Sequence, residues 1–300
     1  AVTAVHFGGG SPTMVRPDDL IDLMAALRSA FRFADDVEIS VEMDPNDLDE
    51  PRYDALAAIG MTRASLGVQD FHPEVQKAIN RIQTFEQTKS VVEAVRARGV
   101  HSVNCDILYG LPHQTDTTVA ETVNDILSLA PDRIALFGYA HVPWMSRRQQ
   151  MIPSDAIPTP EERLGLFETA RLLFLADGYD EIGIDHFARP TDGMAKAAKA
   201  GTLRRNFQGY TDDTSPVLIG LGASSISRFP QGYAQNVSGT SDYTKAIRNG
   251  AFSTHRGHVF TSEDRLRARI IEALMCDFRV NRAELLRDHA VSPERLDELF

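Results

Sequence analysis

The stretch VEISVEM at residues 37–43 alternates apolar and polar side chains, which predicts a β-strand with two unlike faces. Its branched and sulfur-containing side chains fall on one face, while Glu38 and Glu42 fall on the other. The stretches RASLGVQ (63–69) and VNCDILY (103–109) repeat this pattern. A sheet built from such strands can carry helices on its apolar face and leave the polar face open to water.

Strand and helix patterns alternate through the first half of the chain. Pro17 marks one helix start, Thr84 and Gln87 have capping-box spacing, and Gly60 and Gly99 mark helix ends. This order predicts βαβ units and therefore a parallel sheet. The five expected strands are residues 3–7, 37–43, 63–69, 103–109 and 133–140.

The polar strand faces narrow the fold class further. A parallel sheet covered on both sides has nearly continuous apolar strands, and an ordinary TIM barrel fills its interior with branched apolar residues. Neither fits, so we predict a curled, more open α/β barrel that holds a polar ligand. We expect this barrel at residues 1–145, a mixed extension on the substrate side at 146–260, and a helical domain at 261–300.

The bulk composition indicates an ordinary globular protein. The chain has 300 residues, a net charge of −11 and 43% hydrophobic residues, with no apolar run long enough to span a membrane. Its two distant cysteines exclude a disulfide framework and favour a reducing, cytoplasmic setting. The acidic balance argues against nucleic-acid binding. We expect a monomer that binds neither membranes nor nucleic acid.

Three consecutive glycines in VHFGGGSPT (5–13) follow the first expected strand. They match neither the G-x-G-x-x-G dinucleotide fingerprint nor a P-loop, because the required spacing and the Gly-Lys-Ser/Thr are absent. Two interpretations stay open. The glycines form a tight turn, or they leave backbone N–H and C=O groups bare for a small polar ligand.

Polar residues recur where the other expected strands end. They include Glu42, Gln69, Asp106 and the Ala140-His141 pair, and Arg81 lies in the helix after Gln69. Parallel barrels place active sites at the C-terminal ends of their strands, whereas a single carboxylate there is more often a helix cap. Together these groups suit a ligand with a ribose diol and an amino-acid head.

Other kinds of site find little support in the sequence. The nine histidines lack metal-ligand spacing, and no G-x-S-x-G marks a serine nucleophile. Cys105 and Cys276 fall on apolar faces and are expected to be packed thiols. We therefore assign no metal ligand and name no catalytic side chain in this chain, while a Ser-His-Asp arrangement without that motif stays open.

A series of short motifs runs in order along the chain as far as about residue 236. They are HFGGGSPT, SVEMDP, LGVQDF, INRIQT, DILYGLP, FGYAHVP, DHFARP, RNFQGYT, LGASSIS and YAQN. Together they resemble the oxygen-independent coproporphyrinogen III oxidases, which are radical S-adenosylmethionine enzymes of haem biosynthesis. DHFARP and RNFQGYT separate these enzymes from the haem chaperones of the same branch.

The resemblance implies a partial (β/α)6 barrel, a [4Fe–4S] cluster and two S-adenosylmethionine molecules. The first of these molecules would lie at the cluster, where Glu42 would bind its ribose and Gly9 and Ile226 would also contact it. Ser11 stands where the family more often has threonine, so a hydroxyl is kept. The positions that match contacts to the second molecule are Gly10, Ser11, Gln69, Arg81, Asp106 and Ala140.

The implied reaction converts two propionate side chains of coproporphyrinogen III to vinyl groups through a 5′-deoxyadenosyl radical, giving protoporphyrinogen IX and carbon dioxide. Arg189, Arg204 and Arg205 are candidates for binding substrate carboxylates, or are ordinary surface arginines. The alternatives are a haem chaperone without decarboxylase activity and a non-catalytic barrel that has lost its cluster.

The chain departs from the family in one respect, because it has no C-x-x-x-C-x-x-C motif. In the family this motif follows a strand that precedes HFGGG. We therefore expect a fragment that lacks the first barrel strand and the cluster loop and ends inside a helix, so that alone it is inactive. The cluster ligands would lie outside this chain, and an unidentified reductant would supply the cluster with electrons.

Overall fold

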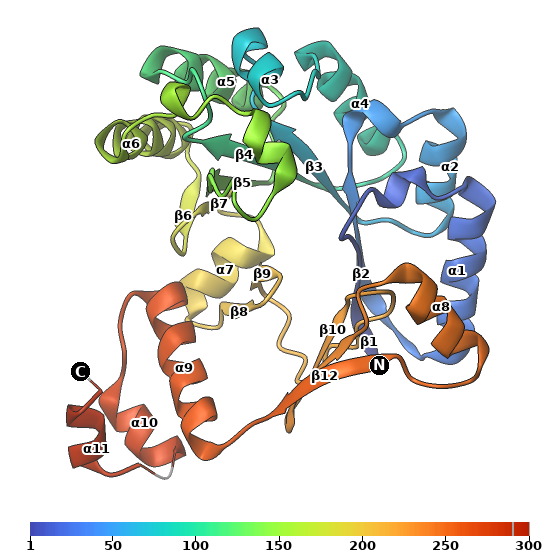
Figure 1. Cartoon of the computed structure of the whole chain (residues 1–300), viewed down its shortest axis with the longest axis vertical. Helices are drawn as coiled ribbons and strands as arrows, with labels where there is room; N and C mark the ends of the chain where they lie inside the picture. The colour runs from blue at the N-terminus through green and yellow to red at the C-terminus, as the bar shows by residue number, and fades with distance from the viewer. Residues whose placement is uncertain (290, 300) are drawn as a thin grey trace. The chain divides into compact units, whose positions relative to one another are not determined.

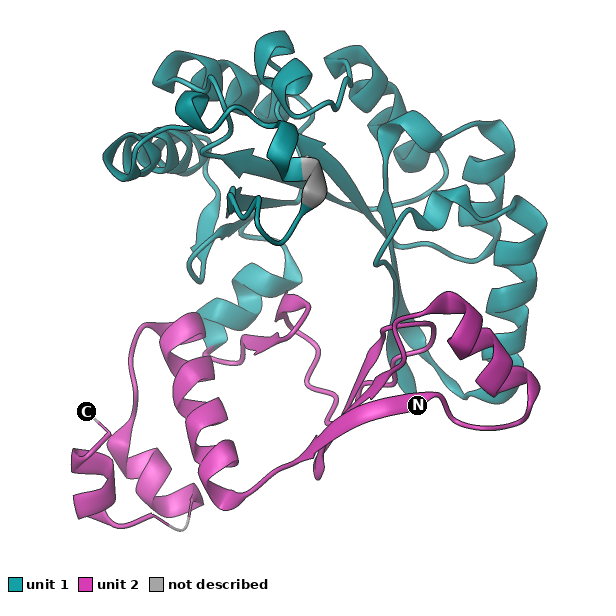
Figure 2. Cartoon of the chain, viewed as in Figure 1, with its two compact units in different colours: residues 1–200 teal, residues 201–300 magenta. Residues whose placement is uncertain are grey.

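The computed structural model describes residues 1–289 and 291–299 and contains two compact units, residues 1–200 and 201–300 (Figure 2). The three-part division expected from the sequence, with boundaries after residues 145 and 260, stays a prediction. Position 300 of the expected last helix lies outside the described residues.

Unit 1 is built on a seven-stranded sheet in the order β1-β2-β3-β4-β5-β7-β6. The first five strands pair in parallel and in chain order, whereas β7 and β6 join in antiparallel fashion. The α/β class and the parallel sheet are thus confirmed, and the partial (β/α)6 barrel stays a prediction. The strands are β1 (Val2–Phe7), β2 (Phe33–Met43), β3 (Arg63–Gln69), β4 (Ser102–Tyr109), β5 (Arg133–Gly138), β6 (Asp180–Ile182) and β7 (His186–Ala188).

Helices follow each of the parallel strands, and Figure 1 shows α1, α2, α4 and α5 along the same side of the sheet. Capping boxes at Thr84, Thr115 and Thr159 satisfy backbone N–H groups at three helix starts. The helices are α1 (Pro17–Ala30), α2 (Glu50–Ala58), α3 (Pro73–Ala78), α4 (Phe85–Ala97), α5 (Asp116–Ser128), α6 (Pro160–Ala176) and α7 (Gly193–Ala200). Short 3-10 turns lie at Pro12–Met14, Pro45–Asp47, Arg147–Met151 and Ser154–Ala156.

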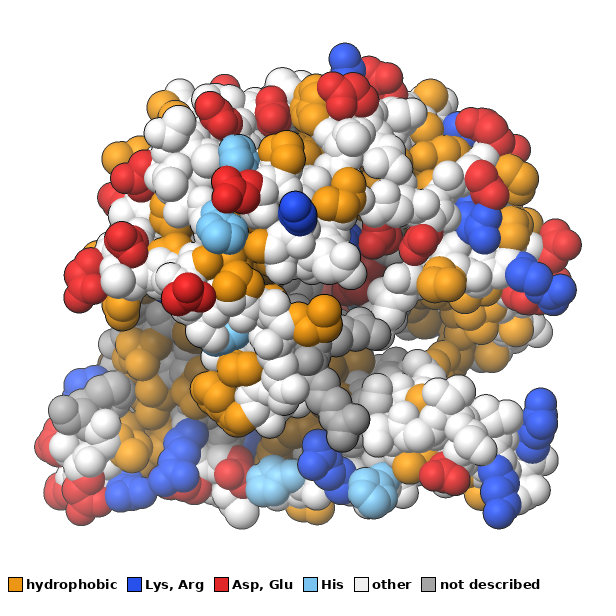
Figure 3. Space-filling view, turned by 45° about the horizontal axis from the view of Figure 1, so that its top comes forward, with side chains coloured by type: hydrophobic (Ala, Val, Ile, Leu, Met, Phe, Trp, Pro, Cys, Tyr) orange, Lys and Arg blue, Asp and Glu red, His pale blue; other side chains and the backbone are white. Residues whose placement is uncertain are grey.

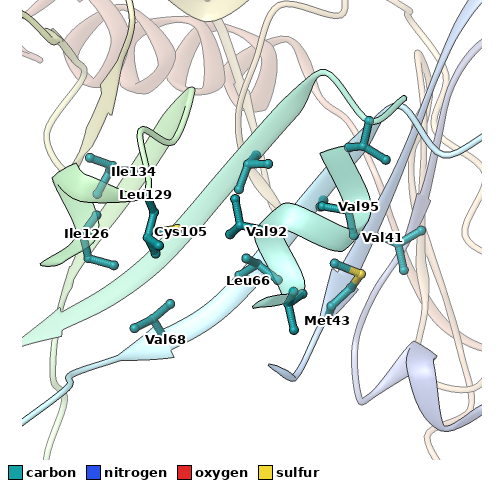
Figure 4. Packing of buried hydrophobic residues seen from close by; sticks show 14 of the residues in the cluster. Val41, Met43, Leu66, Val68, Val92, Val95, Cys105, Ile126, Leu129 and Ile134 are labelled. Carbon is teal, nitrogen blue, oxygen red and sulfur yellow. The ribbon is translucent and has the colours of Figure 1, made fainter. Parts of the chain in front are cut away.

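The hydrophobic core lies between this sheet and its helices. Val41, Leu66 and Cys105 project from three neighbouring strands toward α4, where Val92 and Val95 meet them (Figure 4). All five side chains are buried. Burying a valine or leucine contributes about 1.5–3 kcal/mol each, so the alternating strand pattern directs the apolar face toward the helices and the polar face away from them.

The polar face carries a layer of ion pairs near the beginnings of the strands. Arg63 on β3 lies 2.6 Å from Glu38 on β2, and Arg133 on β5 lies 2.7 Å from Asp192. The side chains of Arg63, Arg133 and Asp192 are each no more than 11% exposed. Buried charged groups need partners of opposite charge, and these ion pairs provide them. The polar residues at the C-terminal ends of the strands are not part of this layer of ion pairs.

Unit 2 combines small antiparallel sheets with helices. Its three-stranded sheet has the order β10-β11-β12, and β8 pairs with β9. Thr261 caps the helix Ser262–Asp277, whose inner face buries Leu266, Ala273 and Cys276. The elements are β8 (Arg204–Asn206), β9 (Gly209–Thr211), β10 (Ile226–Phe229), β11 (Gly232–Asn236), α8 (Thr240–Arg248), β12 (Thr254–Val259), α9 (Ser262–Asp277), α10 (Arg282–Asp288) and α11 (Pro293–Asp297).

On the face drawn in Figure 3, Asp and Glu side chains are scattered among apolar and uncharged ones, and several Lys and Arg side chains lie along its lower edge. Within the described part of the chain, no helix is both long enough and apolar enough to cross a membrane.

Candidate functional site

The glycine turn after β1 meets the end of β2 at Glu42. The Gly9 N–H donates to Oε2 of Glu42 at 3.0 Å, and Nε2 of His6 lies 3.1 Å from Oε1. The hydrogen bond from His6, and then that from Gly9, hold the pKa of Glu42 below its ordinary value. Glu42 is thus an ionised acceptor at the strand end, and its side chain remains 44% exposed.

The three glycines play different parts in this turn. A Cβ on Gly8 would lie 2.5 Å from Nε2 of His6 and 2.7 Å from Oε1 of Glu42. Neighbouring side chains therefore leave no room for a side chain at position 8. Gly9 has a φ of 88°, which favours glycine, and a Cβ on Gly9 or Gly10 would meet no atom within 4 Å. The turn interpretation is therefore supported at Gly9, Gly10 faces open space, and contact of these glycines with a ligand stays a prediction.

Gln69 and Arg81 come together at the end of β3. Gln69 has a φ of 71°, rare for a residue other than glycine, and the register of β3 with β4 is irregular there. Nη2 of Arg81 donates to the Gly67 carbonyl at 2.8 Å and lies 3.0 Å from the Asp44 carboxylate. Nε of Arg81 is buried without a hydrogen-bond partner. This edge therefore holds a paired cation whose side chain is 31% exposed.

Asp106 lies on the polar face of β4, next to Gly67 of β3 in the sheet register. Asn104 donates to it at 2.7 Å and Ser65 lies 3.4 Å away. Burial raises the pKa of this carboxyl, although the hydrogen bond from Asn104 acts in the opposite direction. The same register row continues through Ala135 to His186, so Asp106 and His186 lie on one row of the sheet with Ala135 between them.

The segment after β5 begins at Tyr139 and Ala140 and is tied down by side chains. The Gln149 amide donates to the Ala140 carbonyl at 3.1 Å and accepts from the Val142 N–H at 2.6 Å. Arg163 of α6 donates to the Tyr139 carbonyl at 2.7 Å. The backbone at Ala140 is thus held in place at the C-terminal end of a strand.

A buried polar network supports the unusual backbone at Gln69. Asp70, which is 1% exposed, accepts from the Gln114 amide and from the His72 N–H, both at 2.6 Å. Gln114 also donates to the Leu108 carbonyl at 2.8 Å and thereby links the ends of β3 and β4. Strained residues persist where their surroundings fix them, and this network does so next to Gln69.

The remaining predicted residues are placed as follows. Ser11 is exposed and precedes the turn Pro12–Met14, whereas Ile226 begins β10 in unit 2, and their ligand contacts stay predictions. Arg189 is hydrogen-bonded to Asp177 at 2.7 Å. The Arg189 N–H reaches the carbonyl of Asp132, just before β5, so this arginine lies at the opposite end of the strands and is a poor candidate for the site.

The candidate arginines of unit 2 lie on one short strand. Arg204 and Arg205 belong to β8, and the Arg205 guanidinium lies 5.3 Å from the centre of the Tyr210 ring. Stacking of this kind leaves the planar group able to bond in its plane. Their role toward substrate carboxylates stays a prediction.

Several residues of the site went unnoticed in the sequence. His6, Asp44 and Asn104 contact the predicted Glu42, Arg81 and Asp106. The period-2 rule could have found His6, since alternation along 3–7 places it on the polar face, opposite Ser40 in the register. Asp44 follows a strand end in the same way as the other polar residues.

Neither cysteine is suited to bind a metal. Cys105 is wholly buried, and burial raises the pKa of its thiol far above the ordinary value. Burial raises the pKa of Cys276 to about 11. Among the described residues, no group of three or more His, Cys, Asp or Glu side chains could hold a metal ion. Ligands for a metal cluster therefore are not found in the described part of the chain.

Comparison with known proteins defines the class first. Residues 1–126 match the family model described as the Radical SAM superfamily, whose members use S-adenosylmethionine and a [4Fe–4S] cluster. A solved structure described as coproporphyrinogen III oxidase from Escherichia coli, a radical SAM enzyme, superposes with a TM-score of 0.92 at 37% identity. That match covers 97% of this chain and 67% of the solved one.

Curated relatives identify the family within this class. The chain is 61% identical over 300 residues to the oxygen-independent coproporphyrinogen III oxidase of Paracoccus denitrificans, covering all of this chain and 66% of the relative. It is 38% identical over 284 residues to that of Escherichia coli, covering 95% and 62%. The chain belongs to the oxygen-independent coproporphyrinogen III oxidase family. It spans about two thirds of the length of the curated relatives it matches.

The residues present fit an adenosyl ligand but not the cluster. The partly exposed Glu42 carboxylate, the open space beside Gly9 and Gly10, and the Arg81 guanidinium on a side chain 31% exposed offer acceptors, room and positive charge at one edge of the sheet. A ligand with hydroxyl groups and a carboxylate meets these demands. Cluster ligands, by contrast, are not found among the described residues.

Proposed function

We propose that the full-length protein carries out the oxygen-independent oxidative decarboxylation of coproporphyrinogen III. Two propionate side chains would become vinyl groups, giving protoporphyrinogen IX and carbon dioxide. The observation that carries this proposal is the group of Glu42, Gly9 and Arg81 at one sheet edge, in a chain 61% identical to an oxidase of this name. The relatives named above are oxidases and give no support to a haem chaperone.

The chain's own residues would bind and orient the adenosyl ligands. When bound, S-adenosylmethionine and the reduced cluster supply the one-electron chemistry that the substrate requires. Glu42 would accept from ribose hydroxyls of one molecule, near Gly9. Arg81 would face the carboxylate of a second molecule, and Asp106, half-buried on the same polar face, would accept from its donors.

Three exposed apolar side chains beside this edge suit a large macrocycle. Trp144, Met145 and Met151 are 76%, 81% and 87% exposed, although their segment is tied to Ala140 through Gln149. Exposed apolar groups on an anchored segment commonly mark a binding surface. We infer that the apolar face of the tetrapyrrole lies against them, with its carboxylates directed elsewhere.

Anaerobic turnover of coproporphyrinogen III by the full-length protein, with its cluster loaded and a chemical reductant present, tests the proposal. Wild-type protein should form protoporphyrinogen IX, and Glu42→Ala should abolish this. Haem binding without turnover would instead indicate the chaperone. Calorimetry should show two adenosyl ligands per chain, and one in Glu42→Ala or Asp106→Ala. The reductant, the monomeric state and the cytoplasmic location stay predictions.

A further inference from the structure

His6 stands behind Glu42 and contacts it directly. It lies on β1 opposite Ser40 of β2, with Nδ1 2.8 Å from the Ser40 Oγ and Nε2 3.1 Å from Oε1 of Glu42. An ionised carboxylate only accepts hydrogen bonds, so Nε2 must carry the proton toward Glu42. In the neutral imidazole, Nδ1 then accepts from the Ser40 hydroxyl. The two ring nitrogens therefore have separate partners.

Glu42 is held at both of its oxygens. His6 bonds to Oε1, and the Gly9 N–H donates to Oε2 at 3.0 Å. Each carboxylate oxygen has a second lone pair, and the side chain is still 44% exposed. Two acceptors fixed side by side match the two hydroxyls of a ribose diol. Gly8 packs against one side of the pair, since a Cβ added at this position would overlap both His6 and Glu42.

We propose that His6 is a positioning residue for nucleoside binding, which donates from Nε2 to Glu42 and presents both carboxylate oxygens to the ribose hydroxyls of an adenosyl ligand. The inference rests on the proposed function, from which the adenosyl ligand is taken. Without this donor, Oε1 loses its partner and the carboxylate turns about its last torsion. Binding would then have to fix an orientation that His6 otherwise supplies in advance.

Two substitutions of His6 test the hydrogen bonds of its two ring nitrogens one at a time. The amide of His6→Gln reaches the place of Nε2 and can still donate to Glu42. The amide of His6→Asn reaches only the place of Nδ1, so it keeps the partner Ser40 and loses Glu42. Calorimetry with S-adenosylhomocysteine on the full-length protein should show affinity about tenfold weaker in His6→Asn, the usual effect of losing a charge-assisted bond. His6→Gln should stay within about threefold of wild type.

A second ligand distinguishes positioning from a merely structural effect. The 2′-deoxy analogue of S-adenosylhomocysteine lacks one hydroxyl of the diol, so wild-type protein should bind it more weakly than the parent ligand. In His6→Asn this difference should shrink, because the carboxylate no longer favours two hydroxyls. General damage to the fold would weaken both ligands equally. Gly8→Ala, which displaces the same pair, should behave as His6→Asn does.

The outcomes separate this role from the proposed function. If wild-type protein binds neither ligand, the proposed function fails and the role of His6 fails with it. If wild type binds S-adenosylhomocysteine and His6→Asn binds it equally well, only the role of His6 is overturned. Equal weakening by asparagine and glutamine would also overturn it.

Discussion

Nε of Arg133 lies 2.7 Å from Oδ1 of Asp192, and less than a tenth of either side chain is exposed. The same carboxylate accepts from the Met194 N–H at 2.8 Å, and its other oxygen lies 3.8 Å from Arg63. Asp192→Ala should therefore lower the free energy of unfolding by about 3–5 kcal/mol, because it leaves enclosed guanidinium charge without its carboxylate. Urea denaturation at pH 7 measures this.

Asp177→Ala provides the matched control for Asp192→Ala. Asp177 also pairs with an arginine at 2.7 Å, namely Arg189, but its side chain is 41% exposed. An exposed pair of this kind contributes at most about 1 kcal/mol. If both variants lost the same free energy of unfolding, burial of the Arg133–Asp192 pair would not determine its contribution to stability.

Gly10→Ala should show whether a ligand lies against the glycine turn, because the substitution does not disturb the turn itself. A Cβ at this position meets no atom of the protein within 4 Å, and its backbone is outside the left-handed region. The variant should thus unfold within about 0.5 kcal/mol of wild type. If a ligand lies against the glycine backbone, the added methyl group should weaken S-adenosylhomocysteine binding by about tenfold or more. Unchanged affinity would place the ligand elsewhere.

Gly165→Ala is the control for that substitution. Gly165 lies inside α6, where a Cβ would make an ordinary 3.6 Å contact with Asp116. Alanine is favoured over glycine inside a helix by about 1 kcal/mol. The variant should be as stable as wild type or more so, with no change in ligand affinity.

The parallel sheet was predictable because its signals are local. Alternation in 37–43, 63–69 and 103–109 states which side chains are buried, and the structure buries Val41, Leu66 and Cys105 accordingly. This prediction needs only the period-2 geometry of a strand and the burial of its apolar face. The strand at 2–7 was harder to interpret, since its apolar side chains are only partly buried there.

The contacts within the site were less predictable because they join distant residues. Arg81 meets Asp44 across 37 positions, and Asp70 meets Gln114 across 44. No local pattern selects such partners, since the choice depends on how turns after separate strands fold over one sheet edge. The left-handed backbone of Gln69 was equally hidden, because it is imposed by its surroundings and not by glutamine itself.

Replacing both cysteines should leave the iron content of the full-length protein unchanged. Cys105 is wholly buried and Cys276 is 7% exposed, and burial raises the pKa of both thiols. A thiolate is the form that ligates iron, so neither position suits a cluster. Iron analysis and visible absorption of Cys105→Ala and Cys276→Ala after anaerobic loading measure this. Loss of iron in either variant at normal stability would contradict it.

Glu42 and Asp106 should affect acid stability in opposite directions. The folded state lowers the pKa of Glu42, first through its bond with His6, so its stabilisation is present above the ordinary pKa of about 4.3 and is lost as the pH falls through the folded value. Glu42→Gln lacks this contribution. Its free energy of unfolding should therefore decrease less than that of wild type between pH 6 and pH 3.5.

Asp106→Asn should change the pH dependence of the free energy of unfolding in the opposite direction, measured in the same experiment. Burial raises the folded pKa of Asp106, so the wild-type protein recovers stability as the pH falls through that value toward the ordinary pKa near 3.9. The asparagine variant cannot take up this proton. Its stability should decrease more steeply on acidification than that of wild type, and parallel slopes for both variants would refute the assigned directions.

Trp144→Ser should raise the KM for coproporphyrinogen III and leave the affinity for S-adenosylhomocysteine unchanged. The indole is 76% exposed, so its removal opens no cavity in the core, and the segment stays tied to Ala140 through Gln149. Losing an aromatic contact with the macrocycle should cost roughly 1–2 kcal/mol of binding, or about five- to thirtyfold in KM. Leu172→Ser removes an apolar side chain on α6 that is 55% exposed, and it should change neither value. If Trp144→Ser changed only the affinity for S-adenosylhomocysteine, Trp144 would contact the adenosyl ligand and not the substrate.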